Sequence, residues 1–156
     1  LFLGEWGFDP AWPNADLFRR ELLEMSDRMM LSWAYWSYDP GGWGIWERDE
    51  MGEFVERESA NALVRPYPQR VAGIPRSFSY DPDSRVFSFT FDPSPSSTMP
   101  TEVYLPAGRH YPQGWSLSGC DEDQGCSWTW NSDTEILQIL TLNQTARVEL
   151  TIAPNS

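Results

Sequence analysis

The second half of the sequence contains short runs in which apolar and polar residues alternate. The clearest is RVFSFTF, residues 85–91, in which Phe87, Phe89 and Phe91 fall on one face. A period of two is typical of a β-strand that has one buried face. Similar runs follow, separated by Pro, Gly, Asn and Asp: TEVYLP, CSWTW, TEILQIL and ARVELTI. Short alternating strands at this spacing predict an antiparallel β-sandwich over residues 74–156.

The first half of the sequence has a different rhythm. The apolar run at residues 1–4 predicts a buried strand, and LSWAYWSY at residues 31–38 predicts a second one. Between them, four apolar residues recur at helical spacing, which predicts one face of an amphipathic helix: Phe18, Leu22, Met25 and Met29. A long loop follows, and then a short helix that is ended by Pro66 and Pro68.

This order of elements is the βα rhythm of a parallel sheet, so we expect residues 1–73 to hold two βα units. We place the domain boundary near Gly73, where the texture of the sequence changes. A parallel sheet needs several neighbouring strands and both faces covered. Two units do not meet this need, and residues 1–73 are therefore expected to form one end of a larger domain.

Composition excludes several classes of function. The 156 residues carry a formal net charge of −12, whereas binding to nucleic acid or to anionic membranes requires Lys and Arg. No apolar run reaches the roughly 18 residues that a membrane-spanning helix needs. Aromatic residues are the informative excess, with 9 Trp among them. Indole rings stack on the apolar faces of sugars and also cover lipid, although packing within the core is the plainer explanation.

The two cysteines, Cys120 and Cys126, lie in GCDEDQGC. Their spacing is too wide for a redox CxxC motif, and the single histidine, His110, adds no further metal ligand. We therefore predict one small-loop disulfide and no metal or cofactor. A disulfide indicates an oxidising compartment, so we expect a secreted or extracellular protein.

The ends of the two predicted strands carry the candidate chemistry. Glu5 ends the first strand, and Trp36, Tyr38 and Asp39 end the second. In (β/α)8 barrels the catalytic groups sit at the C-terminal ends of the strands. A carboxylate at one strand end and a tryptophan at the next is an arrangement typical of sugar-cleaving enzymes. Taken alone, Glu5 could equally be a helix cap or an ordinary surface residue.

The combined motifs are more specific. GEWG, a helix, SWAYWSYD, NALVRPYPQRVAG and then a sandwich closely resemble the C-terminal part of family-5 glycoside hydrolases of the endoglycoceramidase type. The resemblance covers essentially the whole sequence. It implies that residues 1–73 are the end of a (β/α)8 barrel and that the sandwich follows it. It further implies that Glu5 is the catalytic nucleophile and that Trp36, or alternatively Trp33, lies beneath the reacting sugar.

The resemblance also implies that half of the active site lies elsewhere. In this family the acid/base is the Glu of an Asn-Glu pair at the end of strand four, and this sequence contains no Asn-Glu dipeptide. We therefore expect an N-terminal portion of the same enzyme, carrying strands one to six, as a partner. Either that portion is held non-covalently in a nicked enzyme, or the sequence is a truncated form.

The loop DPGGWGIW, which follows the second strand, suggests a role in binding lipid. Trp43, Ile45 and Trp46 sit among glycines, where side chains are easily exposed. If the substrate is a glycosphingolipid, an apolar rim here would suit its hydrocarbon chains and would allow peripheral contact with a lipid or micelle surface. The alternative is that these residues fold back onto the rest of the protein.

Three hypotheses for the function remain open. The first is the nucleophile-bearing part of an enzyme that releases intact glycans from ceramide. The second is another family-5 β-glycosidase, such as a glucosylceramidase, a β-glucosidase or a cellulase. The third is a non-catalytic carbohydrate-binding sandwich, for which Trp115, Trp128 and Trp130 would form the sugar platform. Packing between the two sheets explains these three tryptophans equally well.

Overall fold

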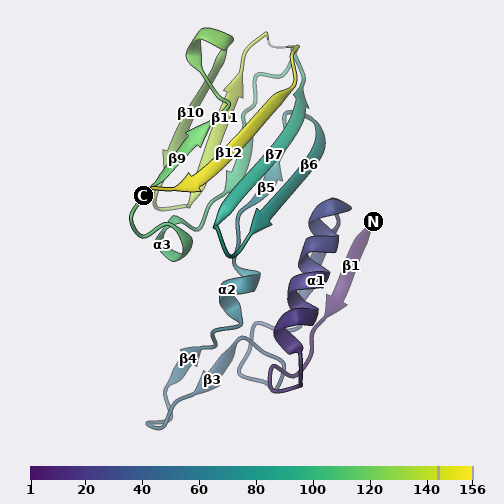
Figure 1. The fold of residues 1–156 in the computed structure, drawn as a ribbon, viewed down its shortest axis with the longest axis vertical. Helices are drawn as coiled ribbons and strands as arrows, with labels where there is room; N and C mark the ends of the chain where they lie inside the picture. Colours follow the sequence, from purple (N-terminus) through teal and green to yellow (C-terminus); the bar gives the residue numbers. More distant parts are fainter. Residues whose placement is uncertain (144, 156) are drawn as a thin grey trace. The chain divides into compact units, whose positions relative to one another are not determined.

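The computed structural model describes residues 1–143 and 145–155 and divides into two compact units, residues 1–64 and residues 65–156. The first unit contains β1 (Phe2–Trp6), α1 (Ala15–Arg28), β2 (Ser32–Tyr35), β3 (Trp46–Arg48), β4 (Phe54–Glu56) and α2 (Ala60–Leu63) (Figure 1). The second contains β5 (Tyr67–Arg70), β6 (Gly73–Asp81), β7 (Val86–Pro93), β8 (Thr101–Tyr104), α3 (Ala107–His110), β9 (Trp115–Ser118), η1 (Glu122–Gln124), β10 (Cys126–Asn131), β11 (Ile136–Thr141) and β12 (Val148–Pro154). In the described ranges, no helix is long and apolar enough to cross a membrane.

The first unit is organised around a parallel pair of strands. β1 pairs with β2 in parallel, with Phe2 opposite Ser32 and Trp6 opposite Tyr35, and α1 connects the two strands. A small apolar cluster holds this βαβ arrangement together. Trp6 from β1 and Leu23 from α1 are both buried in it. The predicted order of strand, helix and strand is confirmed, although β1 extends two residues beyond Gly4 and thus includes Glu5.

The buried face of α1 is not the one that the sequence predicted. Of the predicted stripe, Phe18 and Met29 are 56% and 58% exposed, whereas Arg19 and Leu23 are almost fully buried. Arg19 is accommodated because its guanidinium pairs with Asp16 and lies 5.3 Å from the centroid of the Phe8 ring. The spacing of apolar residues identified the helix correctly, but it identified the packed face only in part, since Leu22 of the stripe packs on the cluster whereas Phe18 and Met29 do not.

The segment after β2 was predicted to be a long loop, and it contains a short antiparallel hairpin. β3 pairs with β4, with Trp46 opposite Glu56 and Arg48 opposite Phe54. The guanidinium of Arg48 lies 4.1 Å from the centroid of the Phe54 ring, and the Asp49 carboxylate accepts hydrogen bonds from the backbone N–H groups of Met51 and Glu53, so both ends of the turn are held. The predicted short helix is the single turn α2.

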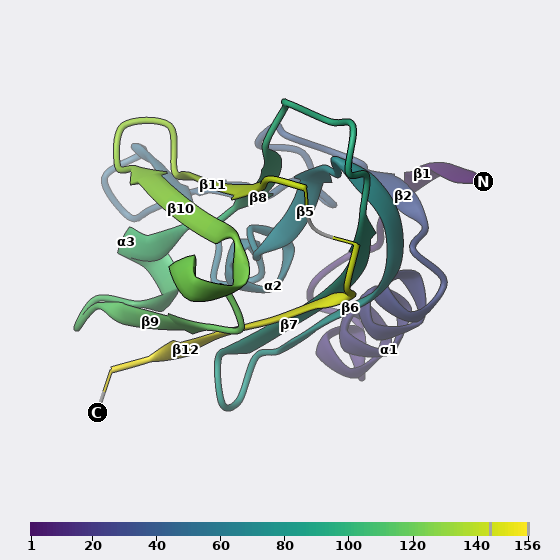
Figure 2. The ribbon, with the colours of Figure 1, turned by 90° about the horizontal axis from the view of Figure 1, so that it is seen from above.

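The second unit is a β-sandwich of two four-stranded antiparallel sheets. Their strand orders are β10-β11-β8-β5 and β6-β7-β12-β9, and Figure 2 shows the two sheets facing each other. The predicted sandwich is confirmed, and so are the strands expected from all five alternating runs. Two strands that the sequence did not predict, β6 and β9, form the two edges of the second sheet.

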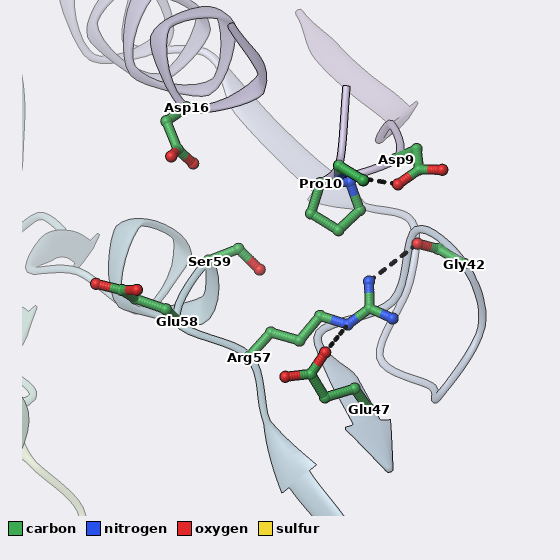
Figure 3. Close-up of a pocket in the computed structure, with 9 residues that line it drawn as sticks. Asp9, Pro10, Asp16, Gly42, Glu47, Arg57, Glu58 and Ser59 are labelled. Atoms are coloured by element: carbon green, nitrogen blue, oxygen red, sulfur yellow. Dashed lines mark hydrogen bonds and ion pairs between the residues drawn. The ribbon is translucent and has the colours of Figure 1, made fainter. Parts of the chain in front are cut away.

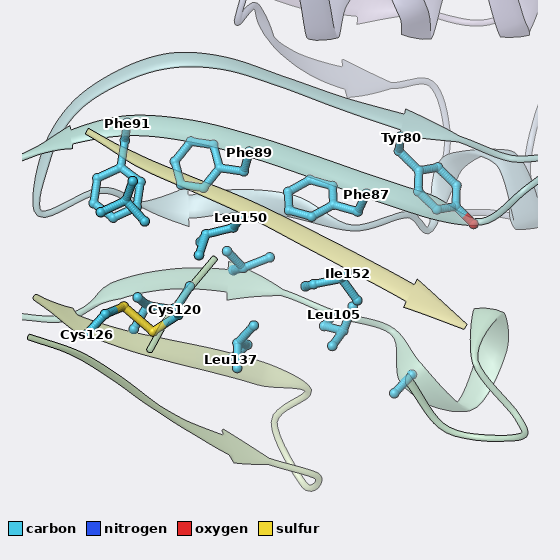
Figure 4. Packing of buried hydrophobic residues seen from close by; sticks show 14 of the residues in the cluster. Tyr80, Phe87, Phe89, Phe91, Leu105, Cys120, Cys126, Leu137, Leu150 and Ile152 are labelled. Atoms are coloured by element: carbon cyan, nitrogen blue, oxygen red, sulfur yellow. A yellow bond between two sulfur atoms is a disulfide. The ribbon is translucent and has the colours of Figure 1, made fainter. Parts of the chain in front are cut away.

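Alternation explains the core of the sandwich. Every second residue of β7 is buried, and Phe87, Phe89 and Phe91 have no exposed surface (Figure 4). They face Leu137 and Leu105, which come from the side of the opposite sheet. Removing several large apolar side chains from water in this way supplies most of the driving force for folding.

The boundary between the two units lies earlier than the expected one at Gly73. The first unit ends at Val64 and the second begins at Arg65, because β5 already belongs to the sandwich as an edge strand beside β8. The sequence obscured this strand, since Pro68 lies inside it and proline is normally found only at sheet edges. An edge position is where β5 occurs.

Candidate active site

Glu5 and Trp36 occupy the same end of the parallel pair. Glu5 is the penultimate residue of β1, and Trp36 follows the last residue of β2, so both lie at the C-terminal ends of their strands. Leu3 and Trp6 both pack in the cluster that contains Leu23 of α1, and the pairing of β1 with β2 shifts register between them. Glu5 lies within this irregular stretch of β1, and it is exposed.

The backbone around Trp36 is tied directly to β1. The Trp36 N–H donates a hydrogen bond to the carbonyl oxygen of Trp6 at 2.8 Å. The peptide bond between Trp36 and Ser37 is cis. The indole of Trp36 is 53% exposed, whereas the alternative residue Trp33 packs with its ring centroid 5.6 Å from that of Trp6. Of the two tryptophans, Trp36 is thus the one that has a face available to a ligand.

Tyr38 and Asp39 begin the loop after β2. Tyr38 is 78% exposed, and its ring lies edge-on to Trp46 with the centroids 5.8 Å apart. Asp39 is also exposed, and hydrogen bonds from the Ser37 side chain and from the Gly41 N–H lower the pKa of its carboxyl. The carboxylate of Asp39 is therefore used to shape its own loop.

The glycine-rich loop is compact. Ile45 is buried, and a Cβ on Gly44 would lie 1.8 Å from the Asp39 carbonyl oxygen, so only glycine fits at that position. Trp43 is 42% exposed, and Trp46 is half-buried at the start of β3. Of the three residues expected at an apolar rim, Trp43 presents its ring to solvent, Trp46 does so in part, and Ile45 faces inward.

Sequence reasoning missed Trp12. This residue lies in the loop after β1, is 58% exposed, and has its ring centroid 6.5 Å from that of Trp43. Both tryptophans thus belong to loops that leave the strand ends at which Glu5 and Trp36 are found. The signal was present, because FDPAWPNAD follows a strand that ends in a candidate catalytic residue.

The same two loops border an open cleft of about 570 Å³ (Figure 3). Its lining is mostly polar and acidic: Asp9, Pro10, Ala11, Asp16, Gly42, Glu47, Arg57, Glu58 and Ser59. Arg57 donates a hydrogen bond to the Gly42 carbonyl at 3.0 Å and lies 3.5 Å from the Glu47 carboxylate. Glu5 and Trp36 do not line this cleft, so it is separate from the strand-end site.

In the sandwich, Cys120 and Cys126 form the expected disulfide. Trp115 contacts Trp128 and Trp130 with centroid distances of 5.5 and 5.8 Å, but the rings are inclined by 51° and 80°. Trp128 and Trp130 lie opposite the buried residues Ile139 and Leu137, and Trp130 packs against the core, whereas Trp128 remains 46% exposed on the edge strand β10. The arrangement is that of packing at the sheet edges, because no flat platform of rings is formed.

The part of the chain that the structure describes contains no group of three or more His, Cys, Asp or Glu side chains placed to hold a metal ion. His110 is buried in α3, with its ring 5.3 Å from that of Tyr80. It belongs to the packing of the sandwich.

Comparison with known proteins gives a consistent result. Residues 65–153 match the family model described as the glycoside hydrolase family 5 C-terminal domain. The chain is 31% identical over 98 residues to endoglycoceramidase I of Rhodococcus hoagii, a match that covers 63% of this chain and 18% of that protein.

Solved structures extend the match to the first unit. The structure of endo-glycoceramidase II from Rhodococcus sp. matches 99% of this chain with a TM-score of 0.79 and 28% identity. Sterylglucosidase 1 of Cryptococcus neoformans matches the same share with a TM-score of 0.73 and 16% identity, a level that shows likeness of fold alone. The chain spans about a third of the length of these solved structures.

Proposed function

Because this chain belongs to the glycoside hydrolase family 5 C-terminal domain family, as the C-terminal portion of an endoglycoceramidase-type enzyme, we propose that it carries the catalytic nucleophile of a retaining glycosidase. The nucleophile is Glu5, and the substrate is a glycosphingolipid whose oligosaccharide is released from ceramide. One observation carries the proposal. Glu5 is exposed at the C-terminal end of β1, and Trp36 is exposed at the C-terminal end of β2, the strand that pairs with β1 in parallel.

The first unit then represents the last two βα units of a (β/α)8 barrel. A parallel pair of strands with a connecting helix on one face is the repeating unit of that fold, and its catalytic groups lie at the C-terminal strand ends. The uncovered face of β1 and β2 would be the barrel interior. The match to endo-glycoceramidase II, which includes the first unit as well as the sandwich, supports this assignment.

In the proposed mechanism, the Glu5 carboxylate attacks the anomeric carbon of the sugar that is bonded to ceramide. The bond from that carbon to the ceramide oxygen breaks as a second carboxylic acid protonates the leaving oxygen. A covalent glycosyl-enzyme results, and water then hydrolyses it with net retention of configuration. A structure of endo-glycoceramidase II is described as a lactosyl-enzyme intermediate, which supports a covalent step for this chain.

The second carboxyl group must come from a partner. Retaining glycosidases hold their two carboxyl groups roughly 5 to 5.5 Å apart. We infer that the acid/base Glu and the remaining barrel strands are supplied by the N-terminal portion of the same enzyme. Without that portion the chain provides the nucleophile and one wall of the site, and activity requires the completed barrel.

Trp36 serves as the floor for the sugar ring in this proposal. Its half-exposed indole offers an apolar face. The backbone N–H of Trp36 is held to β1 by a hydrogen bond to the Trp6 carbonyl oxygen. Tyr38 and Asp39 border the same end of β2 and are proposed to contact substrate at the periphery. Trp33 is proposed to support the site indirectly, because its ring packs against that of Trp6, the residue that follows Glu5.

A lipid aglycone is favoured by the exposed aromatic residues on the loop after β2. Trp43 and Trp46 are proposed to contact the ceramide end, and Tyr38 packs against Trp46. Endo-glycoceramidase II has been solved as a complex with ganglioside GM3, which supports a glycosphingolipid substrate here. The alternative within the family is a β-glycosidase with a different aglycone, since the chain contains only part of the substrate-binding surface.

The disulfide between Cys120 and Cys126 supports a secreted location, because such bonds persist in oxidising compartments. Mass spectrometry of the protein recovered from culture medium tests this. A mass that increases by two hydrogens only after reduction supports secretion with an intact disulfide. Free thiols in the native protein, recovered from inside the cell, contradict it.

Labelling of the nucleophile tests the proposed function directly. The complete enzyme that contains this chain is treated with a 2-deoxy-2-fluoroglycoside, which accumulates the glycosyl-enzyme, and the labelled peptide is identified by mass spectrometry. We expect the label on Glu5 and a loss of at least about 10³-fold in kcat for Glu5→Gln on every substrate. Glu50→Gln, an exposed glutamate after β3, is the matched control and should keep full activity. A label elsewhere, or an active Glu5→Gln enzyme, would sink the proposal.

A further inference from the structure

Two buried tyrosine hydroxyls in the sandwich have no hydrogen-bond partner among the residues that the structure describes. They belong to Tyr80, the penultimate residue of β6, and to Tyr111, which follows α3. The two residues are 4% and 3% exposed, and both lie in the main apolar cluster of the sandwich. Buried polar atoms almost always form hydrogen bonds, because a hydroxyl that leaves water and gains no partner destabilises the fold. These two oxygens therefore require a partner.

The partner must be small. Each hydroxyl oxygen exposes less than 1 Å² of surface, so the residues of this chain already enclose it. A side chain from any further part of the enzyme would have to enter through a surface that is closed. Only a molecule of the size of water, or a small ion, can lie beside these oxygens. This conclusion does not depend on which outer surfaces of the chain the rest of the enzyme covers.

The two hydroxyls lie in the same part of the core. His110, the residue before Tyr111, has its ring centroid 5.3 Å from that of Tyr80. Burial raises the pKa of the Tyr111 phenol, and electrostatic interaction with Tyr80 raises it further. In Figure 4 the Tyr80 ring continues the row of β7 phenylalanines, and its hydroxyl points away from that row. The two groups thus interact without a direct hydrogen bond, as expected of two groups that share a bridging molecule.

The chemistry of this region favours water over an ion. Burial raises the pKa of Tyr80 to about 12, so this phenol stays neutral and both donates and accepts hydrogen bonds. A water molecule does the same, and one molecule can satisfy both hydroxyls without burying a charge. An anion would lose its hydration in the core and would be repelled by the Asp81 carboxylate. The guanidinium groups of Arg65 and Arg85 each donate to a backbone carbonyl.

We propose that one buried water molecule bridges the hydroxyls of Tyr80 and Tyr111 and thereby fastens α3 to the end of β6. α3 is a single turn in the connection from β8, in the first sheet, to β9, in the second. β6 is an edge strand that is paired on one side only. The water would therefore join a connection between the sheets to a strand that has few bonds of its own. The inference concerns the sandwich and is independent of the proposed function.

Crystallography of the complete enzyme tests the site itself. At high resolution we expect one peak of density about 2.7–2.8 Å from both hydroxyl oxygens. The double variant Tyr80→Phe, Tyr111→Phe should lose that peak. Crystals grown in bromide distinguish water from an anion, because bromide scatters anomalously and water does not. An anomalous peak between the two rings, a direct bond between the hydroxyls, or no peak in the parent would overturn the inference.

Hydrogen exchange of the complete enzyme tests the role of the bridge in solution. The Tyr111 N–H donates to the Ala107 carbonyl at 2.8 Å and reports on the opening of α3. Tyr80→Phe and Tyr111→Phe should each raise its exchange rate about fivefold, the effect of losing one buried hydrogen bond. The double variant should exchange little faster than either single variant, because both effects depend on the same water. Effects that multiply in the double variant would contradict a shared water.

Tyr104→Phe is the matched control. The Tyr104 hydroxyl also lies in the sandwich, but it donates to the Glu135 carboxylate at 3.1 Å. This variant should leave the exchange of the Tyr111 amide unchanged, alone and in combination with Tyr80→Phe. If Tyr104→Phe accelerates the exchange as much as Tyr80→Phe does, the amide reports general loosening of the sandwich, and the bridge is refuted.

Discussion

Gly7 and Trp36 are in such close contact that a Cβ on Gly7 would lie 2.2 Å from the Trp36 carbonyl oxygen. The same Cβ would lie 3.6 Å from a ring carbon of Trp43. Gly7 directly follows β1, so the absence of a side chain there allows the segment after β2 to lie against β1. Because of this contact, the positions of Trp36 and Trp43 depend on the same glycine.

We therefore expect Gly7→Ala to displace Trp36 and Trp43 together. The methyl group would meet backbone that cannot move freely, and overpacking of this kind costs about 1–3 kcal/mol. In the complete enzyme, kcat/KM should fall on both lipid and aryl substrates, and the melting temperature should fall as well. The matched control is Gly42→Ala, because nothing lies within 4 Å of a Cβ at that position. Similar behaviour of the two variants would contradict the prediction.

Trp36 and Trp33 should separate function from stability. Trp36→Ala removes an exposed indole, so kcat/KM should fall by roughly 10- to 100-fold while the melting temperature stays within about one degree of the parent. Trp33→Ala removes a packing partner of Trp6 and should destabilise the protein by about 2 kcal/mol or more. Steady-state kinetics and thermal unfolding of both variants check the assignment, and the opposite pattern would exchange the two roles.

Asp92 should make the stability of the sandwich dependent on pH at the acidic end. Hydrogen bonds of 2.7 Å from the Nε atoms of Arg147 and Arg76 lower the pKa of Asp92 to about 2. Its value in the unfolded chain is about 3.9, so the stabilisation is fully present above that pH and is lost as the pH falls towards 2. The Asp92 side chain is 28% exposed, so salt should weaken the effect.

The measurement for Asp92 is thermal unfolding between pH 2 and pH 7, at low and high salt, for the parent and for Asp92→Asn. The variant should melt at a lower temperature near neutral pH, and the two curves should converge near pH 2. Asp133→Asn, an exposed aspartate in the turn before β11, serves as the control. Parallel curves for Asp92→Asn and the parent across the whole pH range would refute the prediction.

The disulfide should stabilise the edge of the sandwich where the two sheets meet. Cys120 follows β9 in one sheet, and Cys126 begins β10 in the other. Closing a loop with a sequence separation of 6 limits the unfolded chain and is worth about 2 kcal/mol. The double variant Cys120→Ala, Cys126→Ala should lose that amount in denaturant unfolding. Reduction of the parent should reproduce the loss, and a variant as stable as the parent would argue against it.

The strands of the sandwich were predicted from a single buried face, and the structure confirmed them. The alternation of Phe87, Phe89 and Phe91 requires a half-buried strand, since a slip of one residue would expose all three rings. Strand-end reasoning likewise brought Glu5 and Trp36 to one edge, because parallel strands share that edge. Neither argument depended on distant parts of the sequence.

The remaining features depend on tertiary contacts that local patterns do not encode. The buried face of α1 contains Arg19, which is stabilised by Asp16 and by the ring of Phe8. A pattern of apolar residues cannot anticipate a buried guanidinium. The first strand of the sandwich was hidden by Pro68, and Trp12 was overlooked because its ring contact is with Trp43, 31 positions later in the printed sequence.

The place of β12 in its sheet has a consequence for how the protein is made. β12 lies between β7 and β9, yet it is the last of the described strands to be synthesised. Until it emerges, Phe87, Phe89 and Phe91 lack the neighbouring strand that flanks them in the finished sheet. The sandwich therefore depends on pairing between distant segments and assembles late, after translation has passed residue 154. During that interval the partly made chain needs protection from aggregation.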